Sequence, residues 1–146
     1  MTRSVGRAAC GVLTALAIGG ATVAQADEAP EIFTVITSPS PETQFMALIL
    51  TTQAVEQGAA ARVLLCDEGG ALGLSKTETP AFGPRSLTPS QLLRGLVEGG
   101  TTVEVCAIFL PGREEEAADL IEGVWVAAPP DVAAHMIRPN VRYFTF

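Results

Sequence analysis

The sequence predicts an α/β fold, a three-layer sandwich in which helices cover both faces of a five-stranded parallel sheet. Short β-branched or apolar segments alternate with segments of helical periodicity from residue 31 to residue 146. Such alternation is typical of parallel sheets with right-handed helical crossovers. The chain has 120 residues after residue 26, a length that suits one compact domain. We therefore expect a single domain at 27–146.

The first 26 residues have the pattern of a secretory signal peptide. Arg3 and Arg7 form a basic start, 11–24 is an apolar run without charge, and 24–26 is Ala-Gln-Ala, a pattern that signal peptidase cleaves. The apolar run is shorter than the roughly 20 residues of a membrane span. We expect cleavage after Ala26 and a periplasmic or secreted protein; the alternative is an uncleaved N-terminal anchor.

The charge of the remaining chain disfavours two classes of partner. All 16 acidic residues but only seven of the nine basic ones lie after residue 26, so the net charge there is about −9. Nucleic acids and anionic membranes are bound through basic surfaces. We therefore expect no nucleic-acid partner, and no membrane association after signal cleavage.

The first half of the domain contains two expected strands and one helix. Residues 31–37 are β-branched and end at Ser-Pro-Ser-Pro, which predicts the first strand. Ser40 and the proline after it begin a helix whose apolar positions recur until Gly58. Residues 61–66 form the second strand. The stretch 71–87 has no sustained period and predicts a long irregular loop, which is often functional or mobile.

The second half begins with a helix that starts at Thr88, in a Thr-Pro-Ser-Gln capping box, and ends at a Gly-Gly pair. The stretch 101–113 is interpreted as the third strand, with Cys106 near its end and a Pro-Gly break before Arg113. Acidic residues 114–116 suit the first turn of a third helix. The remaining expected elements are a fourth strand, a fourth helix and a fifth strand, at 124–126, 129–138 and 141–146.

The common order for five such strands is 2-1-3-4-5, with ligands bound where strands 1 and 3 diverge. In that order Asp67 and the residues after the first strand, including Ser38, Ser40 and Thr43, would line the ligand cleft. The glycine-rich nucleotide fingerprint is absent from the first strand–helix turn. We therefore expect neither a dinucleotide nor a nucleoside triphosphate, and no cofactor.

Cys66 and Cys106 both fall near the carboxyl ends of their strands. In the expected order strand 1 separates them by two ladder spacings, roughly 9–10 Å, whereas a disulfide requires Cα atoms within about 7 Å. We therefore expect no bond between them in the monomer. Cys66 is interpreted as a core residue. For Cys106 two interpretations stay open: a packed core thiol, or a thiolate favoured by a following helix N-terminus and by Arg113.

Other chemistries have less support in the sequence. His135 is the only histidine and is interpreted as a residue on the face of the last helix. The cysteines lack Cys-x-x-Cys spacing, so we expect no zinc or other metal site. No Gly-x-Ser-x-Gly motif is present, which disfavours a serine hydrolase.

Several segments together resemble the DsrE/DsrF-like (YchN-like) family, and the resemblance covers nearly all of the chain after residue 26. The segments that carry it are 46–50 (Met-Ala-Leu-Ile-Leu), 56–58 (Glu-Gln-Gly), 62–68 (Arg-Val-Leu-Leu-Cys-Asp-Glu), 103–111 (Val-Glu-Val-Cys-Ala-Ile-Phe-Leu-Pro), 119–124 and 139–146. The resemblance implies a five-stranded α/β sandwich that assembles into homotrimers or homohexamers. In the sulfur-relay members a strand-end cysteine holds sulfane sulfur as a persulfide, and Cys106 matches that position.

The resemblance therefore implies a sulfur carrier with Cys106 as sulfur acceptor and with donor and acceptor proteins as partners. The N-terminal pattern implies that this carrier is exported, and the charge of Arg113 would support the Cys106 thiolate. Sulfur-relay members are cytoplasmic, whereas this chain has an export signal. The alternative is a non-catalytic oligomeric module that binds a small ligand or a partner and in which Cys106 is packed. A third interpretation is a thiol-redox sensor that uses Cys106 across a subunit interface. The sequence leaves open whether the protein is an enzyme.

Overall fold

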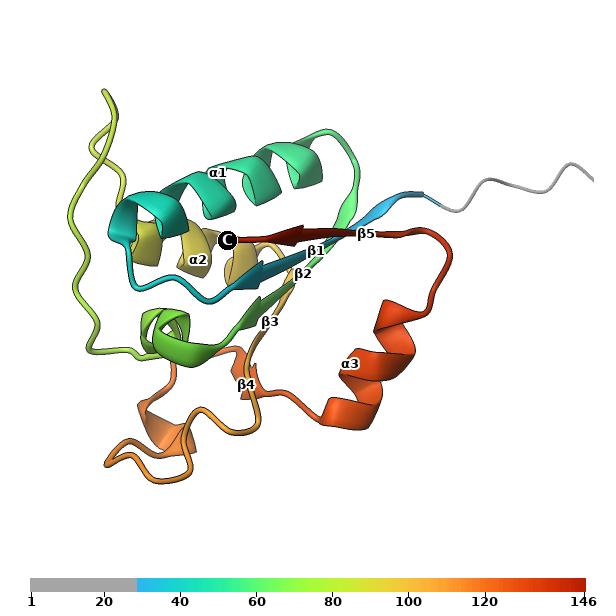
Figure 1. Ribbon diagram of the computed structural model, residues 1–146. Coiled ribbons are helices and arrows are strands. Elements are labelled where there is room, and N and C mark those ends of the chain that lie inside the picture. Colours follow the sequence, from blue (N-terminus) through green and yellow to red (C-terminus); the bar gives the residue numbers. More distant parts are fainter. Residues whose placement is uncertain (1–28) are drawn as a thin grey trace, which may run out of the picture.

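The computed structural model describes residues 29–146, which form one sheet of five parallel strands with helices on both faces (Figure 1). The predicted signal peptide, its cleavage after Ala26 and Cys10 lie outside the described residues. The elements are β1 (Glu31–Ile36), α1 (Pro41–Glu56), β2 (Ala60–Leu65), the 3₁₀ helix η1 (Asp67–Gly73), α2 (Pro89–Glu98), β3 (Thr102–Val105), the 3₁₀ helix η2 (Ala117–Asp119), β4 (Val124–Val126), α3 (Pro129–Met136) and β5 (Val141–Thr145). In this part of the chain, no helix has the length and apolar character needed to cross a bilayer.

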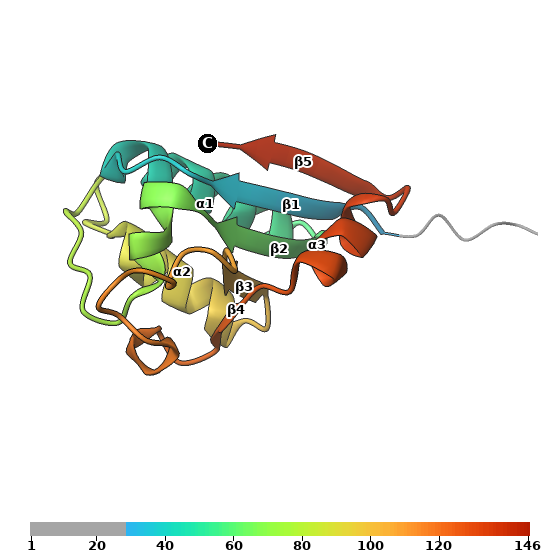
Figure 2. The ribbon, with the colours of Figure 1, turned by 60° about the horizontal axis from the view of Figure 1, so that its bottom comes forward.

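The predicted sandwich is confirmed, but the predicted strand order 2-1-3-4-5 is wrong. The strands lie in the order β4-β3-β2-β1-β5, and β5, β1 and β2 run side by side in the same direction in Figure 2. Helices α1 and α2 pack together on one face of the sheet. Two successive right-handed crossovers on one face move the chain in one direction, from β1 to β2 to β3. Helix α3 then crosses the opposite face and returns the chain to β5, beside β1.

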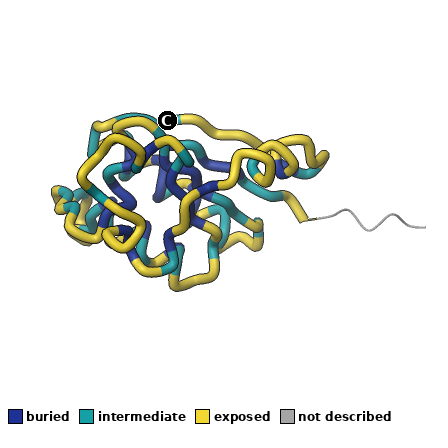
Figure 3. Tube along the Cα trace, turned by 90° about the horizontal axis from the view of Figure 1, so that it is seen from below, coloured by how far each residue is buried: buried dark blue, intermediate teal, exposed yellow. Residues whose placement is uncertain are grey.

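Two groups of buried side chains hold the layers together. The larger lies between the sheet and α1 with α2, and includes Ile36, Leu48, Val63 and Leu93. The smaller lies on the α3 face and contains Phe33, Leu64, Ala127 and Val141. Burial is concentrated in the central strands, whereas most of α3 and β5 is exposed (Figure 3). Helix α3 has only eight residues. It therefore covers a smaller part of the sheet than α1 and α2 cover on the opposite face.

The predicted starts of the first two helices are confirmed. The Ser40 side chain accepts a hydrogen bond from the backbone N–H of Thr43 at 3.4 Å, at the N-terminus of α1. At α2 the capping box is complete: Thr88 Oγ1 accepts from Gln91 N at 3.1 Å, and Thr88 N donates to Gln91 Oε1 at 2.9 Å. Such caps satisfy N–H groups that have no partner inside a helix.

The helix predicted after the third strand does not form. Only the 3₁₀ turn Ala117–Asp119 is present between β3 and β4. Leu120 instead forms an antiparallel bridge with Leu74, and both side chains are buried. An extended backbone at Leu120 is incompatible with a helix through 114–123, so tertiary pairing overrides the acidic helix-start signal.

Candidate thiol site

A disulfide joins Cys66 to Cys106, and the expectation that these thiols are too far apart is therefore wrong. Strands β2 and β3 are neighbours, with Leu65 paired to Val105, so the two cysteines follow at the next position of the same register. The Cys106 N–H donates to Leu65 O at 2.8 Å, and the two Cα atoms are 5.0 Å apart. This is one ladder spacing rather than two, within the range that a disulfide spans.

An open hollow of about 520 Å³ lies beside the disulfide, at the carboxyl edge of the sheet. Its lining residues are Cys66, Asp67, Cys106, Ile108, Phe109, Pro111 and Arg113. The structure therefore brings three of the sequence-predicted site residues together: Cys106, Asp67 and Arg113. Arg113 is the cationic side chain among those lining residues, and its guanidinium carbon lies 4.4 Å from the centroid of the Phe109 ring.

The segment after Cys66 is held against the sheet by close backbone packing. A Cβ atom on Gly69 would lie 2.5 Å from Ile36 O, and one on Gly70 would overlap the Phe109 ring. Gly69 N donates to Thr37 O at 3.1 Å, and Asp67 has a left-handed backbone with φ 51°. Glycine permits this approach because it has no Cβ. One wall of the hollow is consequently fixed by backbone contacts.

Ser38, Ser40 and Thr43 lie at the start of α1 and are not lining residues of this hollow. Ser38 N donates to Phe146 O at 3.3 Å, and Ser38 Oγ accepts from Ser40 N at 3.1 Å. Their hydrogen bonds start the helix and hold the C-terminal residue beside β1. In the observed order β2 separates β1 from β3, so the expected cleft between strands 1 and 3 does not exist.

A second, apolar hollow of about 260 Å³ borders Cys106 on the α3 side. Its walls include Leu64 from the sheet, Ile108 from the loop after β3, and Val132 and Met136 from α3. Cys106 thus lies between an apolar hollow and the hollow that contains Arg113. No local pattern in the sequence predicts this second hollow, because it depends on α3 covering the ends of β2 and β3.

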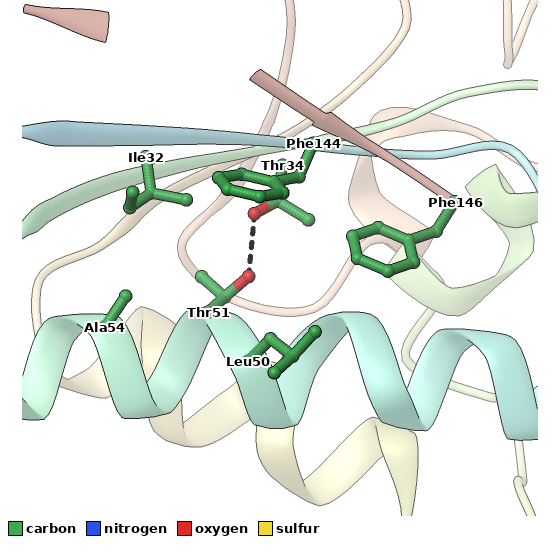
Figure 4. A pocket seen from close by; sticks show the side chains of 7 residues that line it. All are labelled: Ile32, Thr34, Leu50, Thr51, Ala54, Phe144 and Phe146. Atoms are coloured by element: carbon green, nitrogen blue, oxygen red, sulfur yellow. Dashed lines mark hydrogen bonds between the residues drawn. The ribbon is translucent and has the colours of Figure 1, made fainter. Parts of the chain in front are cut away.

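A third hollow, of about 200 Å³, lies between α1 and the β1–β5 side of the sheet (Figure 4). Thr34 and Thr51 share a hydrogen bond of 2.7 Å at its floor, and the Phe144 and Phe146 rings flank it. Leu50 lies at its α1 side. Thr51 Oγ1 also donates to a backbone carbonyl of α1 at 2.9 Å, so both threonine hydroxyls are hydrogen-bonded and the surface left for contact is nearly all apolar.

A charged cluster anchors α3 to the first strand. His135 is buried on α3, where its ring meets the Phe33 ring edge to face at 5.1 Å. Its Nδ1 lies 3.7 Å from a Glu31 carboxylate oxygen, and Arg138 pairs with the other oxygen of Glu31 at 2.8 Å. Burial is the main cause that lowers the pKa of His135; Arg62 and Arg138 act in the same direction, and Glu31 opposes them.

Because its pKa is lower in the folded state, His135 is expected to make the fold less stable in mild acid. The unfolded chain takes up a proton as pH falls through about 6.5, whereas the folded protein resists protonation until its own lower pKa. The free energy of unfolding should therefore be flat above pH 6.5 and fall below it, by at most about 1.4 kcal/mol per pH unit. Urea denaturation between pH 7.5 and about 5.5 measures this. His135→Gln should abolish the slope in this window, and an unchanged slope would contradict the assignment.

Within residues 29–146, no three His, Cys, Asp or Glu side chains lie close enough together to hold a metal ion.

Comparison with known proteins identifies the family. No protein-family model matches the chain. The chain is 31% identical over 117 residues to the uncharacterized protein MJ0989 of Methanocaldococcus jannaschii, an alignment that covers 78% of this chain and 98% of that protein. Among solved structures it is similar to the ychN protein from E. coli, with a TM-score of 0.67 and 21% identity over 82% of this chain and 100% of the other.

A further similar structure is the protein of unknown function MTH1491 from Methanobacterium thermoautotrophicum, with a TM-score of 0.60 and 15% identity over 82% of this chain and 100% of the other. Both solved structures have the DsrE/DsrF-like fold. The chain therefore has the DsrE/DsrF-like fold and belongs to the same protein family as MJ0989.

Proposed function

We propose that this protein is a thiol-based sulfur carrier in which reduced Cys106 holds sulfane sulfur as a persulfide. The observation that carries the proposal is the position of Cys106: it borders both the hollow with Arg113 and the apolar hollow under α3, whereas Cys66 borders only the first. The resemblance to sulfur-relay proteins supports the same residue. Arg113 supplies positive charge on the side from which an anionic donor approaches, and a nearby cation favours thiolate.

The proposed chemistry starts from the disulfide. A dithiol reductant opens the Cys66–Cys106 bond and is itself oxidised to a disulfide. The Cys106 thiolate then attacks the outer sulfur of a sulfane donor, such as thiosulfate. A sulfur–sulfur bond forms on Cys106, and the donor leaves as sulfite. An acceptor thiolate attacks the outer sulfur of the persulfide, takes that sulfur and releases the Cys106 thiolate. Donor and acceptor proteins are the partners that this cycle requires.

We also propose that the cycle operates outside the cytoplasm, as the N-terminal sequence predicts. In an oxidising compartment a disulfide between Cys66 and Cys106 persists until a dithiol reductant reaches it. Both cysteines are partly exposed and line the open hollow, which is the side from which such a reductant would approach.

Intact-mass spectrometry of the reduced protein after incubation with thiosulfate tests sulfur uptake. Cys10→Ser is included in all samples so that only Cys66 and Cys106 respond. We expect the mass to rise by one sulfur atom and this added mass to be lost on treatment with dithiothreitol. Cys66→Ser should show the same gain, and Cys106→Ser should show none. Thiosulfate and inorganic polysulfide are both tested as donors. No adduct with either donor, in the chain with both cysteines and in Cys66→Ser alike, would refute the proposed role, as would equal adducts in Cys106→Ser.

A second candidate function is a homo-oligomeric binding module, favoured by the apolar hollow of Figure 4. Leu50 and Phe144 are 50% and 46% exposed at this hollow, and Met46 is also exposed on α1. Clustered exposed apolar side chains are typical of interaction surfaces. We propose a second copy of this chain as the occupant, because β5 is an edge strand whose outer backbone groups can pair with another copy.

Size-exclusion chromatography with light scattering measures the mass of this assembly. We expect a trimer or hexamer for the wild type, and a shift to monomer for Leu50→Glu, because a carboxylate cannot be buried in an apolar contact without a partner. Glu42→Gln, an exposed change on the same helix, is the matched control and should leave the mass unchanged. A monomeric wild type would exclude this candidate.

A further inference from the structure

We infer that Cys66 is the resolving thiol of this site: it attacks the Cys106 persulfide, closes the Cys66–Cys106 disulfide and releases hydrosulfide. The inference rests on the proposed function of Cys106 as a sulfur acceptor. It assigns a role to a second cysteine, which does not occupy the position of the sulfur-accepting cysteine in the sulfur-relay proteins.

The sheet register places the two thiols for this reaction. Cys66 and Cys106 occupy equivalent positions on adjacent parallel strands, with Cα atoms 5.0 Å apart. The sulfur atom that Cys66 bonds in the structure is the same Cys106 Sγ that it attacks in the persulfide. Both groups are held at the same edge of one sheet, so the reaction is unimolecular and pays no entropy of encounter.

Backbone hydrogen bonds hold both cysteines independently of the disulfide. Cys66 N donates to Ile36 O at 2.9 Å, and Cys66 O accepts from Gly70 N at 3.2 Å. Cys106 N donates to Leu65 O at 2.8 Å, and Cys106 O accepts from Phe109 N at 2.8 Å. These bonds do not involve sulfur and remain when the disulfide is reduced. The reduced site therefore keeps the thiols within reach of each other.

The reaction balances without a further reagent. The Cys66 thiolate forms a bond to Cys106 Sγ, the bond between Cys106 Sγ and the outer sulfur breaks, and the outer sulfur leaves as hydrosulfide. The Cys66 sulfur is oxidised from thiolate to disulfide, the outer sulfur is reduced to sulfide, and Cys106 Sγ exchanges one sulfur–sulfur bond for another. An acceptor thiol must therefore capture the outer sulfur before Cys66 reacts. Otherwise the product is hydrosulfide and an oxidised site, which needs a dithiol reductant for another cycle.

The experiment follows the persulfide with time after loading. Reduced full-length chain carrying Cys10→Ser is loaded with thiosulfate or polysulfide, freed of donor, and followed by intact mass and by hydrosulfide assay. We expect the protein with both cysteines to lose the added sulfur, release one hydrosulfide per persulfide and become lighter by two hydrogens than the reduced form. The rate should be independent of protein concentration. In Cys66→Ser and Cys66→Ala the persulfide should last at least about tenfold longer, because the intramolecular attack is lost.

The outcomes separate this inference from the function on which it rests. A Cys106 persulfide that forms in the Cys66 variants and decays as fast as in the parent chain overturns the role of Cys66 and leaves sulfur carriage intact. A decay rate proportional to protein concentration, with disulfides between chains, also overturns it. No adduct in any sample overturns sulfur carriage and the inference together. Circular dichroism checks the fold of each variant, and the coupled appearance of hydrosulfide and disulfide in the parent chain tests the inference without either variant.

Discussion

Replacing Glu104 by alanine is expected to lower the free energy of unfolding by about 3–5 kcal/mol, the usual cost of removing one partner of a buried ion pair. Glu104 accepts from Arg62 Nε at 2.7 Å and Nη2 at 2.6 Å, and each side chain is only 11% exposed. The pair joins β2 to β3 on the face below α3. Alanine leaves the Arg62 guanidinium buried without its carboxylate. Urea denaturation at pH 7 measures the loss.

The control is the removal of both charges. Arg62→Met with Glu104→Leu replaces the pair by apolar side chains, and buried pairs replaced in this way are often neutral or stabilising. We therefore expect the double variant to be at least about 2 kcal/mol more stable than Glu104→Ala. A Glu104→Ala variant within about 1 kcal/mol of the parent would show that the pair behaves as a surface salt bridge does.

Reduction of the Cys66–Cys106 disulfide is expected to lower the free energy of unfolding by up to about 4 kcal/mol. The bond joins residues separated by 40 positions, and the chain-entropy model gives this magnitude for a loop of that length. The disulfide restricts the unfolded chain, whereas the register of β2 and β3 holds the cysteines together in the folded state in either redox form. Urea denaturation of the Cys10→Ser chain, with and without a phosphine reductant, measures the difference.

The matched control for this prediction is Cys66→Ser with Cys106→Ser. Its denaturation midpoint should not respond to reductant and should lie close to that of the reduced parent. A parent whose midpoint is the same in both redox conditions would contradict the stabilising role of the bond. A cooperative unfolding transition of the reduced parent would also show that the reduced form required for sulfur uptake is folded.

The buried pair itself could have been anticipated in part. Glu104 lies within the strand Thr-Val-Glu-Val, and a carboxylate in a buried strand requires a partner. The sequence contains that signal, but Arg62 is 42 positions away. Arg62 is identified as the partner only when β2 is known to lie beside β3.

Elements with local signals were predicted well. The strand at 31–36, the proline-started helices and the Thr88 capping box depend on propensity and on hydrogen bonds within a few residues. The helix predicted after β3 is wrong because a long-range contact, rather than a local signal, decides the backbone there. Its acidic start is a weak local preference, and the bridge between Leu74 and Leu120 is a tertiary contact that overrides it.

By itself the sequence determined that this chain forms a parallel α/β sandwich and that Cys66 and Cys106 end two of its strands, because hydrophobic period and chain breaks are local properties. Only the tertiary structure decided that these strands are neighbours. The direction of each crossover depends on which face its helix covers, and with α1 and α2 on the same face β3 lies beside β2. That placement turns two separate thiols into one disulfide-bonded site.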